Sequence, residues 1–127
     1  MNKYFTKEYI KECDCPEIQE LRRKGLEYGD WFWSSIHVGI YYKEDPELFF
    51  FLPTGDQLDE EIVKICKKKN YTFKSDFYLA LPKSKNHKEF YEITYFKWLH
   101  SYCVNNIKYT HTNPYLAKIK LLKELLK

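Results

Sequence analysis

The sequence predicts an α+β fold: a single domain over residues 1–127, in which a small, mostly antiparallel sheet of three to four strands is covered by helices. Two observations predict it. Segments with apolar residues at helical spacing and segments rich in aromatic and β-branched residues follow one another without a regular strand–helix alternation. The composition, 44% hydrophobic and 31% charged, provides enough apolar material for one core and too much for a disordered chain.

The first third of the chain predicts two short helices and then a strand. Residues 3–12 can form a helix, and a second helix begins after Asp14, with Pro16 at its first position, where a proline ring is favoured. Residues 31–42 are rich in aromatic and β-branched side chains, which favours one strand. The more apolar face of that strand is expected to face the core: Phe32, Ser34, Ile36, Val38, Ile40 and Tyr42.

The middle of the chain predicts a second strand and the clearest helix. The apolar run 48–52 is typical of a strand covered on both faces, and we expect it to pair antiparallel with 31–42. Thr54 and Gln57 have the spacing of a capping box, which begins a helix after Pro53. The buried face of this helix is expected to carry Leu58, Ile62, Ile65 and Cys66.

The second half predicts a strand at 71–81, a basic loop at 82–88 and a long helix at 89–104. Asn105 and Asn106 are expected to end that helix in a left-handed conformation. Its buried arc would carry Tyr91, Tyr95, Trp98, Leu99 and Tyr102.

The end of the chain predicts a short extended piece at 107–110 and a terminal helix. Thr112 or Asn113 is the expected cap of this helix, and Pro114 is its first residue. Its apolar stripe is Tyr115, Ile119, Leu122, Leu125 and Leu126.

Charge is divided unevenly along the chain. The formal net charge is +3, but residues 1–61 hold 7 basic and 14 acidic side chains (net −7), and residues 62–127 hold 14 basic and 4 acidic ones (net +10). This distribution favours a partner of opposite charge, self-association, or neutralisation of one half by the other within the fold.

The sequence favours a cytoplasmic protein without a cofactor. No apolar run approaches the ~20 residues of a membrane span, and no secretory apolar region follows the start, so the four cysteines are expected to be reduced. Cys13, Cys15, His100 and Cys103 are soft ligands that could hold zinc, but their spacing is not that of a zinc knuckle, and no metal is predicted.

Catalysis has little support in the sequence. The four histidines lie in no hydrolase or metalloprotease motif, and four glycines provide no phosphate-binding loop. No catalytic residue is therefore assigned, although an active site assembled from distant positions stays open.

Three segments resemble those of a known group of proteins. They are Cys15-Pro-Glu-Ile-Gln-Glu-Leu-Arg22, Tyr28-Gly-Asp30 and Phe51-Leu-Pro-Thr-Gly-Asp-Gln-Leu58, in that order. The patterns E-I-Q-x-L, G-D-x-[FW] and L-P-x-x-D-Q-L resemble those of small uncharacterised proteins encoded by phages and prophages of low-GC bacteria. The resemblance implies a mobile-element origin and, with it, a binding or host-modulating role rather than metabolic catalysis.

Two sets of residues are candidates for binding. The less apolar face of the strand 31–42 has residue types suited to a protein partner: Trp31, Trp33, His37 and Tyr41. A lysine-rich stretch interleaved with aromatic residues is suited to phosphates and stacked bases: Lys67, Lys68, Lys69, Lys74, Lys83, Lys85 and Lys88. Each set has a plainer explanation, because helix ends favour lysines and a helical layer could cover the tryptophans.

These observations predict a phage or prophage accessory protein that binds a host or phage macromolecule, a protein first, and so inhibits a host defence or regulatory system. The alternative is a nucleic-acid or nucleotide-binding protein that uses the lysines of the second half. No membrane partner is expected, and a homodimer is compatible with the charge pattern.

Overall fold

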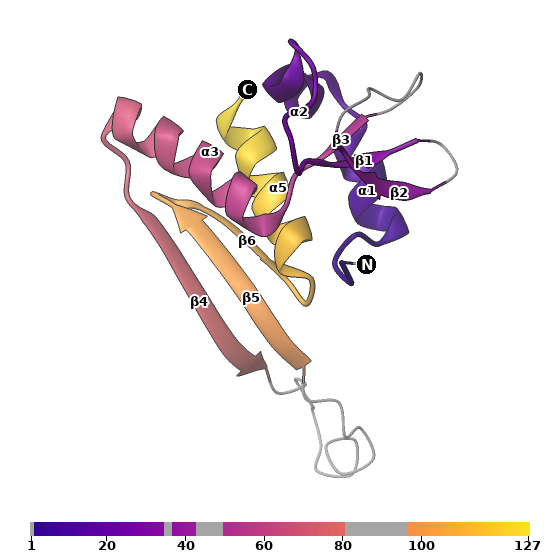
Figure 1. Cartoon of the computed structure of the whole chain (residues 1–127). Coiled ribbons are helices and arrows are strands. Elements are labelled where there is room, and N and C mark those ends of the chain that lie inside the picture. The colour runs from indigo at the N-terminus through magenta and orange to yellow at the C-terminus, as the bar shows by residue number, and fades with distance from the viewer. Residues whose placement is uncertain (1, 35–36, 43–49, 81–96) are drawn as a thin grey trace, which may run out of the picture.

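The computed structural model describes residues 2–34, 37–42, 50–80 and 97–127 (Figure 1). It confirms the α+β class, with the strands in two three-stranded antiparallel sheets ordered β2–β1–β3 and β4–β5–β6. The elements are α1 (Lys7–Cys13), α2 (Pro16–Gln19), a 3₁₀ turn (Glu20–Arg22), β1 (Trp31–Trp33), β2 (Val38–Ile40), β3 (Phe50–Leu52), α3 (Gly55–Lys69), β4 (Phe73–Ala80), β5 (Lys97–Val104), β6 (Ile107–His111) and α5 (Pro114–Leu125).

Three helices begin where their local signals place them, whereas the helix expected over 3–12 begins only at Lys7, where the Thr6 side chain caps it. Thr54 and Gln57 form the predicted capping box of α3: the Thr54 Oγ1 accepts from the Gln57 backbone N–H at 3.3 Å, and the Gln57 Oε1 accepts from the Thr54 N–H at 2.8 Å. The Asn113 side chain caps α5, and Pro114 is its first residue, as predicted. Pro16 likewise begins α2.

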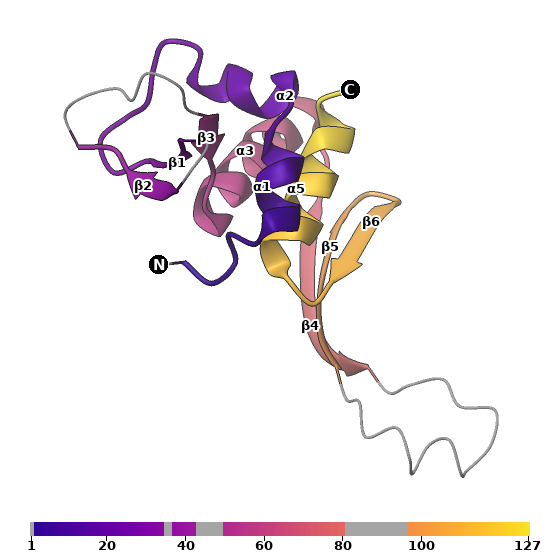
Figure 2. The same ribbon diagram turned by 90° about the vertical axis from the view of Figure 1, so that its right-hand side faces the viewer.

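The core lies between the helices and the second sheet. In Figure 2, α1 lies against α5, and α5 packs on α3 and on the face of β5 and β6. Leu58, Ile62 and Cys66 of α3 are buried there, which confirms most of the predicted stripe. The largest fully enclosed side chains include Tyr9, Ile18, Leu52, Leu116, Ile119, Leu121 and Leu122. Burying each such aliphatic side chain contributes roughly 1.5–3 kcal/mol.

The prediction of one strand over 31–42 is wrong. The chain folds back within this segment, so that β1 and β2 pair antiparallel with Trp31 opposite Ile40, and β3 pairs with the other edge of β1. Ser34 marks the return, because its backbone N–H donates to the His37 carbonyl at 3.0 Å.

The face of β1 that packs on the core is also the opposite of the one predicted. Trp31 and Trp33 pack against the core, and Phe32 lies on the opposite face. The Phe32 ring lies over Gly39, the residue opposite it on β2. A side chain at position 39 would clash, because its Cβ would lie 2.7 Å from the Phe32 ring.

The predicted helix over 89–104 is wrong at its end, where residues 97–104 form β5; residues 82–96 lie outside the described ranges. β5 pairs antiparallel with β4 along eight residues and with β6 along five. Asn105 does adopt the left-handed conformation, at φ 55°, but it turns β5 into β6 instead of ending a helix. The strands expected at 71–81 and 107–110 are present as β4 and β6.

The Gln19 side chain forms hydrogen bonds with the backbone of β3 along the edge that β1 does not occupy. Its Oε1 accepts from the Phe51 backbone N–H at 2.7 Å, and its Nε2 donates to the Phe51 carbonyl at 3.0 Å and to the Cys13 carbonyl at 2.8 Å. One side chain therefore makes the bonds that a further strand would make, and it ties α1 and α2 to the sheet.

We expect Gln19→Ala to lower the free energy of unfolding by about 1–3 kcal/mol, because it leaves backbone groups of a buried strand without partners. Urea denaturation followed by circular dichroism measures this change. Glu20→Ala is the matched control, since Glu20 is exposed and its ion pair is with exposed Arg23, and it should stay within about 0.5 kcal/mol. Equal midpoints for the two variants would contradict the role given to Gln19.

Candidate binding cleft

The three segments that carry the resemblance meet in one polar network. The buried Asp30 carboxylate accepts from Arg22 Nε at 2.6 Å, from Gln57 Nε2 at 2.8 Å and from the Glu27 backbone N–H at 2.8 Å. The Arg22 guanidinium also lies 4.4 Å over the Phe51 ring. Every buried side-chain nitrogen and oxygen of the described residues has a partner. The network therefore holds the segments together and leaves none of its buried side-chain polar atoms unpaired.

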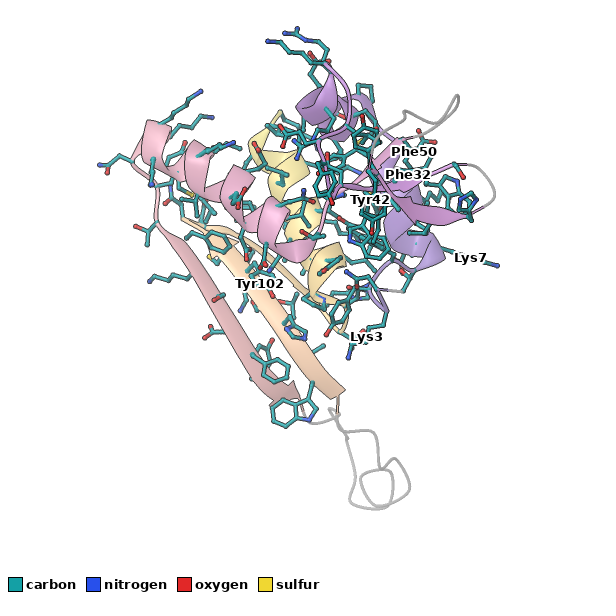
Figure 3. The ribbon with its side chains drawn as sticks, viewed as in Figure 1. Lys3, Lys7, Phe32, Tyr42, Phe50 and Tyr102 are labelled. Atoms are coloured by element: carbon teal, nitrogen blue, oxygen red, sulfur yellow. The ribbon has the colours of Figure 1, made fainter. Side chains whose placement is uncertain are left out.

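A separate cleft of about 610 Å³ opens between α3, α5 and the β4–β5 face. Asp59 and Val63 of α3 form one wall, and Lys118 of α5 closes the inner end. The floor consists of strand residues that alternate onto the same face: Phe73, Ser75 and Phe77 of β4, and His100 and Tyr102 of β5. Figure 3 shows Tyr102 where β5 passes below α3.

Lys118 is fully engaged at the inner end of the cleft. Its Nζ lies 2.9 Å from the Asp59 Oδ2 and 5.0 Å from the centre of the Tyr102 ring. Burial, together with the charge of Asp59, raises the pKa of the Tyr102 hydroxyl to about 12. Burial and the charge of Lys118 lower the pKa of His100, so its imidazole is neutral at pH 7.

The outer end of the cleft is an aromatic stack, defined here as Phe77, Trp98 and His100. Phe77 stacks on Trp98 with ring centres 4.8 Å apart and lies 4.5 Å from the His100 ring. Phe77 is 59% exposed and Trp98 54% exposed. In Figure 1, β4 and β5 extend past the helices toward the end of the pair that carries Ala80 and Lys97. The stack is thus an exposed aromatic surface.

The predicted protein-binding residues do not form one exposed face. Trp31 and Trp33 are half-buried against the core, and the Trp31 ring packs edge-on against Phe5. His37 is exposed beyond β1, where its Nδ1 lies 3.0 Å from the Ser34 hydroxyl. Tyr41 is half-buried, and its backbone N–H donates to the Asp30 carbonyl at 2.7 Å.

The predicted anion-binding lysines are divided. Lys67, Lys68 and Lys69 lie exposed in the last turn of α3, where the helix dipole favours cations. Lys74 is exposed on β4, on the face away from the aromatic stack. Lys83, Lys85 and Lys88 lie outside the described residues.

Sequence reasoning missed the aromatic stack and the Lys118–Asp59 pair. The alternation of Trp98, His100, Tyr102 and Val104 was the available signal for the stack, because a strand places all four on one face. The ion pair had no local signal, since its two residues lie on different helices and 59 positions apart.

The comparisons with known proteins provide no relative. No protein-family model, no curated protein and no solved structure matches the chain. Two findings bear on cofactors and membranes: in the described ranges no three His, Cys, Asp or Glu side chains gather as a metal would require, and no helix is long and apolar enough to cross a bilayer.

Proposed function

We propose that the protein is a binding module that acts stoichiometrically, by capturing a partner protein on the aromatic stack of Phe77, Trp98 and His100. The supporting observation is the exposure of two large stacked rings beside a cleft. Rigid aromatic side chains dominate the energy of protein interfaces because they bury large areas at a small entropy cost. The partner chemistry that fits is an apolar or aromatic side chain inserted over Phe77.

A protein partner fits this surface better than a nucleic acid. Single-strand binders combine stacking rings with free cations that track the phosphates. Of the described residues that line this cleft, the one cation is Lys118, and its charge is neutralised by Asp59. The lysine cluster of α3 adjoins the start of β4, whereas Phe77 lies toward the other end of that strand.

A phage or prophage origin, and inhibition of a host defence or regulatory system, belong to the same proposal. They rest on the resemblance of three segments to phage-encoded proteins, and the polar network around Asp30 explains those segments structurally. A protein that inhibits by stoichiometric binding needs an exposed contact surface, and the aromatic stack would provide it.

We expect Phe77→Ala and Trp98→Ala each to weaken capture of the partner roughly tenfold or more, because each removes half of the exposed stack. The test compares tagged wild-type and variant chains in nuclease-treated bacterial lysate, with the captured proteins quantified. Tyr78→Ala is the matched control, since Tyr78 is an exposed aromatic residue on the opposite face of β4. Loss of the captured species on nuclease treatment would favour nucleic acid, and equal capture by all variants would contradict the proposed surface.

A further inference from the structure

The outer edge of β4 offers a row of backbone groups to another strand. β4 pairs only with β5 among the described strands, and Lys74, Ser75, Asp76 and Phe77 are exposed. The Asn105 N–H donates to the Thr72 carbonyl at 3.4 Å, so the backbone of Thr72 faces β5. Hydrogen bonding alternates along an antiparallel strand, which leaves the N–H and C=O groups of Phe73, Ser75 and Phe77 facing outward.

The sequence of this edge is complementary to itself. The edge sequence is Phe73-Lys74-Ser75-Asp76-Phe77. Read in the opposite direction it again has a phenylalanine at each end and serine in the centre, with the positions of the lysine and the aspartate exchanged. If two copies lie antiparallel with Ser75 opposite Ser75, then Lys74 of each copy lies opposite Asp76 of the other, and Phe73 lies opposite Phe77. Directly opposite side chains have Cβ atoms about 4.5–5.5 Å apart, close enough for two ion pairs and two aromatic pairs.

The charges select this register over its neighbours. A shift of two residues is the smallest that keeps the outward backbone groups and the apolar face matched. In one direction the shift sets Lys74 opposite Lys74, and in the other it sets Asp76 opposite Asp76. A single charged residue on an edge strand commonly blocks pairing, but here Asp76 supplies the countercharge for Lys74.

We propose that two copies of this chain associate through their β4 edges, with the two-fold axis at Ser75, and so join two three-stranded sheets into one of six strands. Phe77 of the second copy then lies beside Phe73, at the wall of the cleft where Val63 of α3 is exposed. The two aromatic stacks come onto one continuous sheet face, which gives the assembly two copies of the binding surface. The dimer does not depend on any partner.

The test is the mass of the full chain by sedimentation equilibrium over a range of concentrations. The wild type should approach twice the 15.6 kDa of one chain. Lys74→Glu and Asp76→Lys each replace both ion pairs with like charges, so each should weaken dimerisation on the order of tenfold to a hundredfold. Mixing these two variants should restore a dimer, because each substituted side chain then lies across the axis from a residue of opposite charge in the other copy.

Two further variants separate the interface from folding. Ser75→Pro removes an N–H that faces away from β5, so the monomer should keep its circular dichroism spectrum while the dimer is lost. Lys108→Glu makes the same charge change as Lys74→Glu on β6, across β5 from Lys74, and should leave the dimer intact. A monomeric wild type, or a dimer that Lys74→Glu, Asp76→Lys and Ser75→Pro leave unchanged, would overturn the proposal. The Lys74 side chain lies on the face of β4 away from the aromatic stack, and the mass is measured without any partner, so failure here is distinct from failure of partner binding.

Discussion

Asp30→Ala is expected to lower the free energy of unfolding by about 3–5 kcal/mol, because it leaves the largely buried Arg22 guanidinium without its hydrogen-bonded, buried counterion. The side chains of Arg22 and Asp30 are 16% and 3% exposed, and the Nε–Oδ2 distance is 2.6 Å. Burial alone would lower the pKa of Arg22, but the hydrogen bond and charge of Asp30 outweigh it and raise that pKa. The substitution also removes the acceptor for Gln57 and for the Glu27 N–H.

Chemical denaturation at pH 7, followed by circular dichroism, measures the effect. Glu27→Ala is the matched control, because Glu27 pairs with the same guanidinium at 3.6 Å but is 75% exposed. An exposed pair contributes about 0–1 kcal/mol, so Glu27→Ala should be nearly neutral. Asp30→Asn keeps the shape of the side chain without its charge and should fall between the two. If Asp30→Ala were no more destabilising than Glu27→Ala, the network would not hold the three segments together.

Three helix starts could be predicted because their signals are local. Thr54 with Gln57, Pro16 and Asn113-Pro114 each determine a helix start within four residues, and the structure confirms all three. The error at β5 has a physical source. Trp98 and Tyr102 are four residues apart, a spacing that places two side chains on one face of a helix and also on one face of a strand. His100, midway between them, shares their face in a strand but not in a helix. Pairing with β4 stabilises the strand.

The return of the chain between β1 and β2 carried only a weak local signal, since Ser34 and Ser35 are its turn-type residues and no glycine or proline lies between Trp33 and Val38. The cleft is harder still to predict. It exists because α3 and α5 pack on only part of the β4–β5 face, and the positions of Lys118 and Phe77 relative to one another follow from that packing. Tertiary arrangement of this kind is not encoded in any single segment.

Stability is expected to fall steeply between pH 9 and pH 12, because Cys13 is enclosed as a neutral thiol. Burial raises the pKa of Cys13 from 9.0 to about 12, an effect that exceeds the lowering by the neighbouring Tyr9 side chain. The folded-state pKa lies above the unfolded-state pKa, so the contribution to stability is complete below pH 9. It is lost as the pH rises toward 12 and the unfolded chain alone ionises, which amounts to about 4 kcal/mol. Burial raises the pKa of Tyr9 as well, and that adds to the loss above pH 10.

The Cys13→Ala variant measures how much of this pH dependence comes from the Cys13 thiol. Removing the side chain lowers stability at every pH by leaving a small cavity, but the additional loss between pH 8 and pH 11 should shrink by about 3 kcal/mol relative to the wild type. Urea denaturation at the two pH values measures the difference. Cys103→Ala serves as control, since Cys103 is only half-buried on β5 and its replacement should leave the pH dependence as in the wild type. If Cys13→Ala and the wild type lost equal stability over this interval, the alkaline transition would belong to other groups whose pKa burial raises, such as Tyr9, Cys66 and Tyr102.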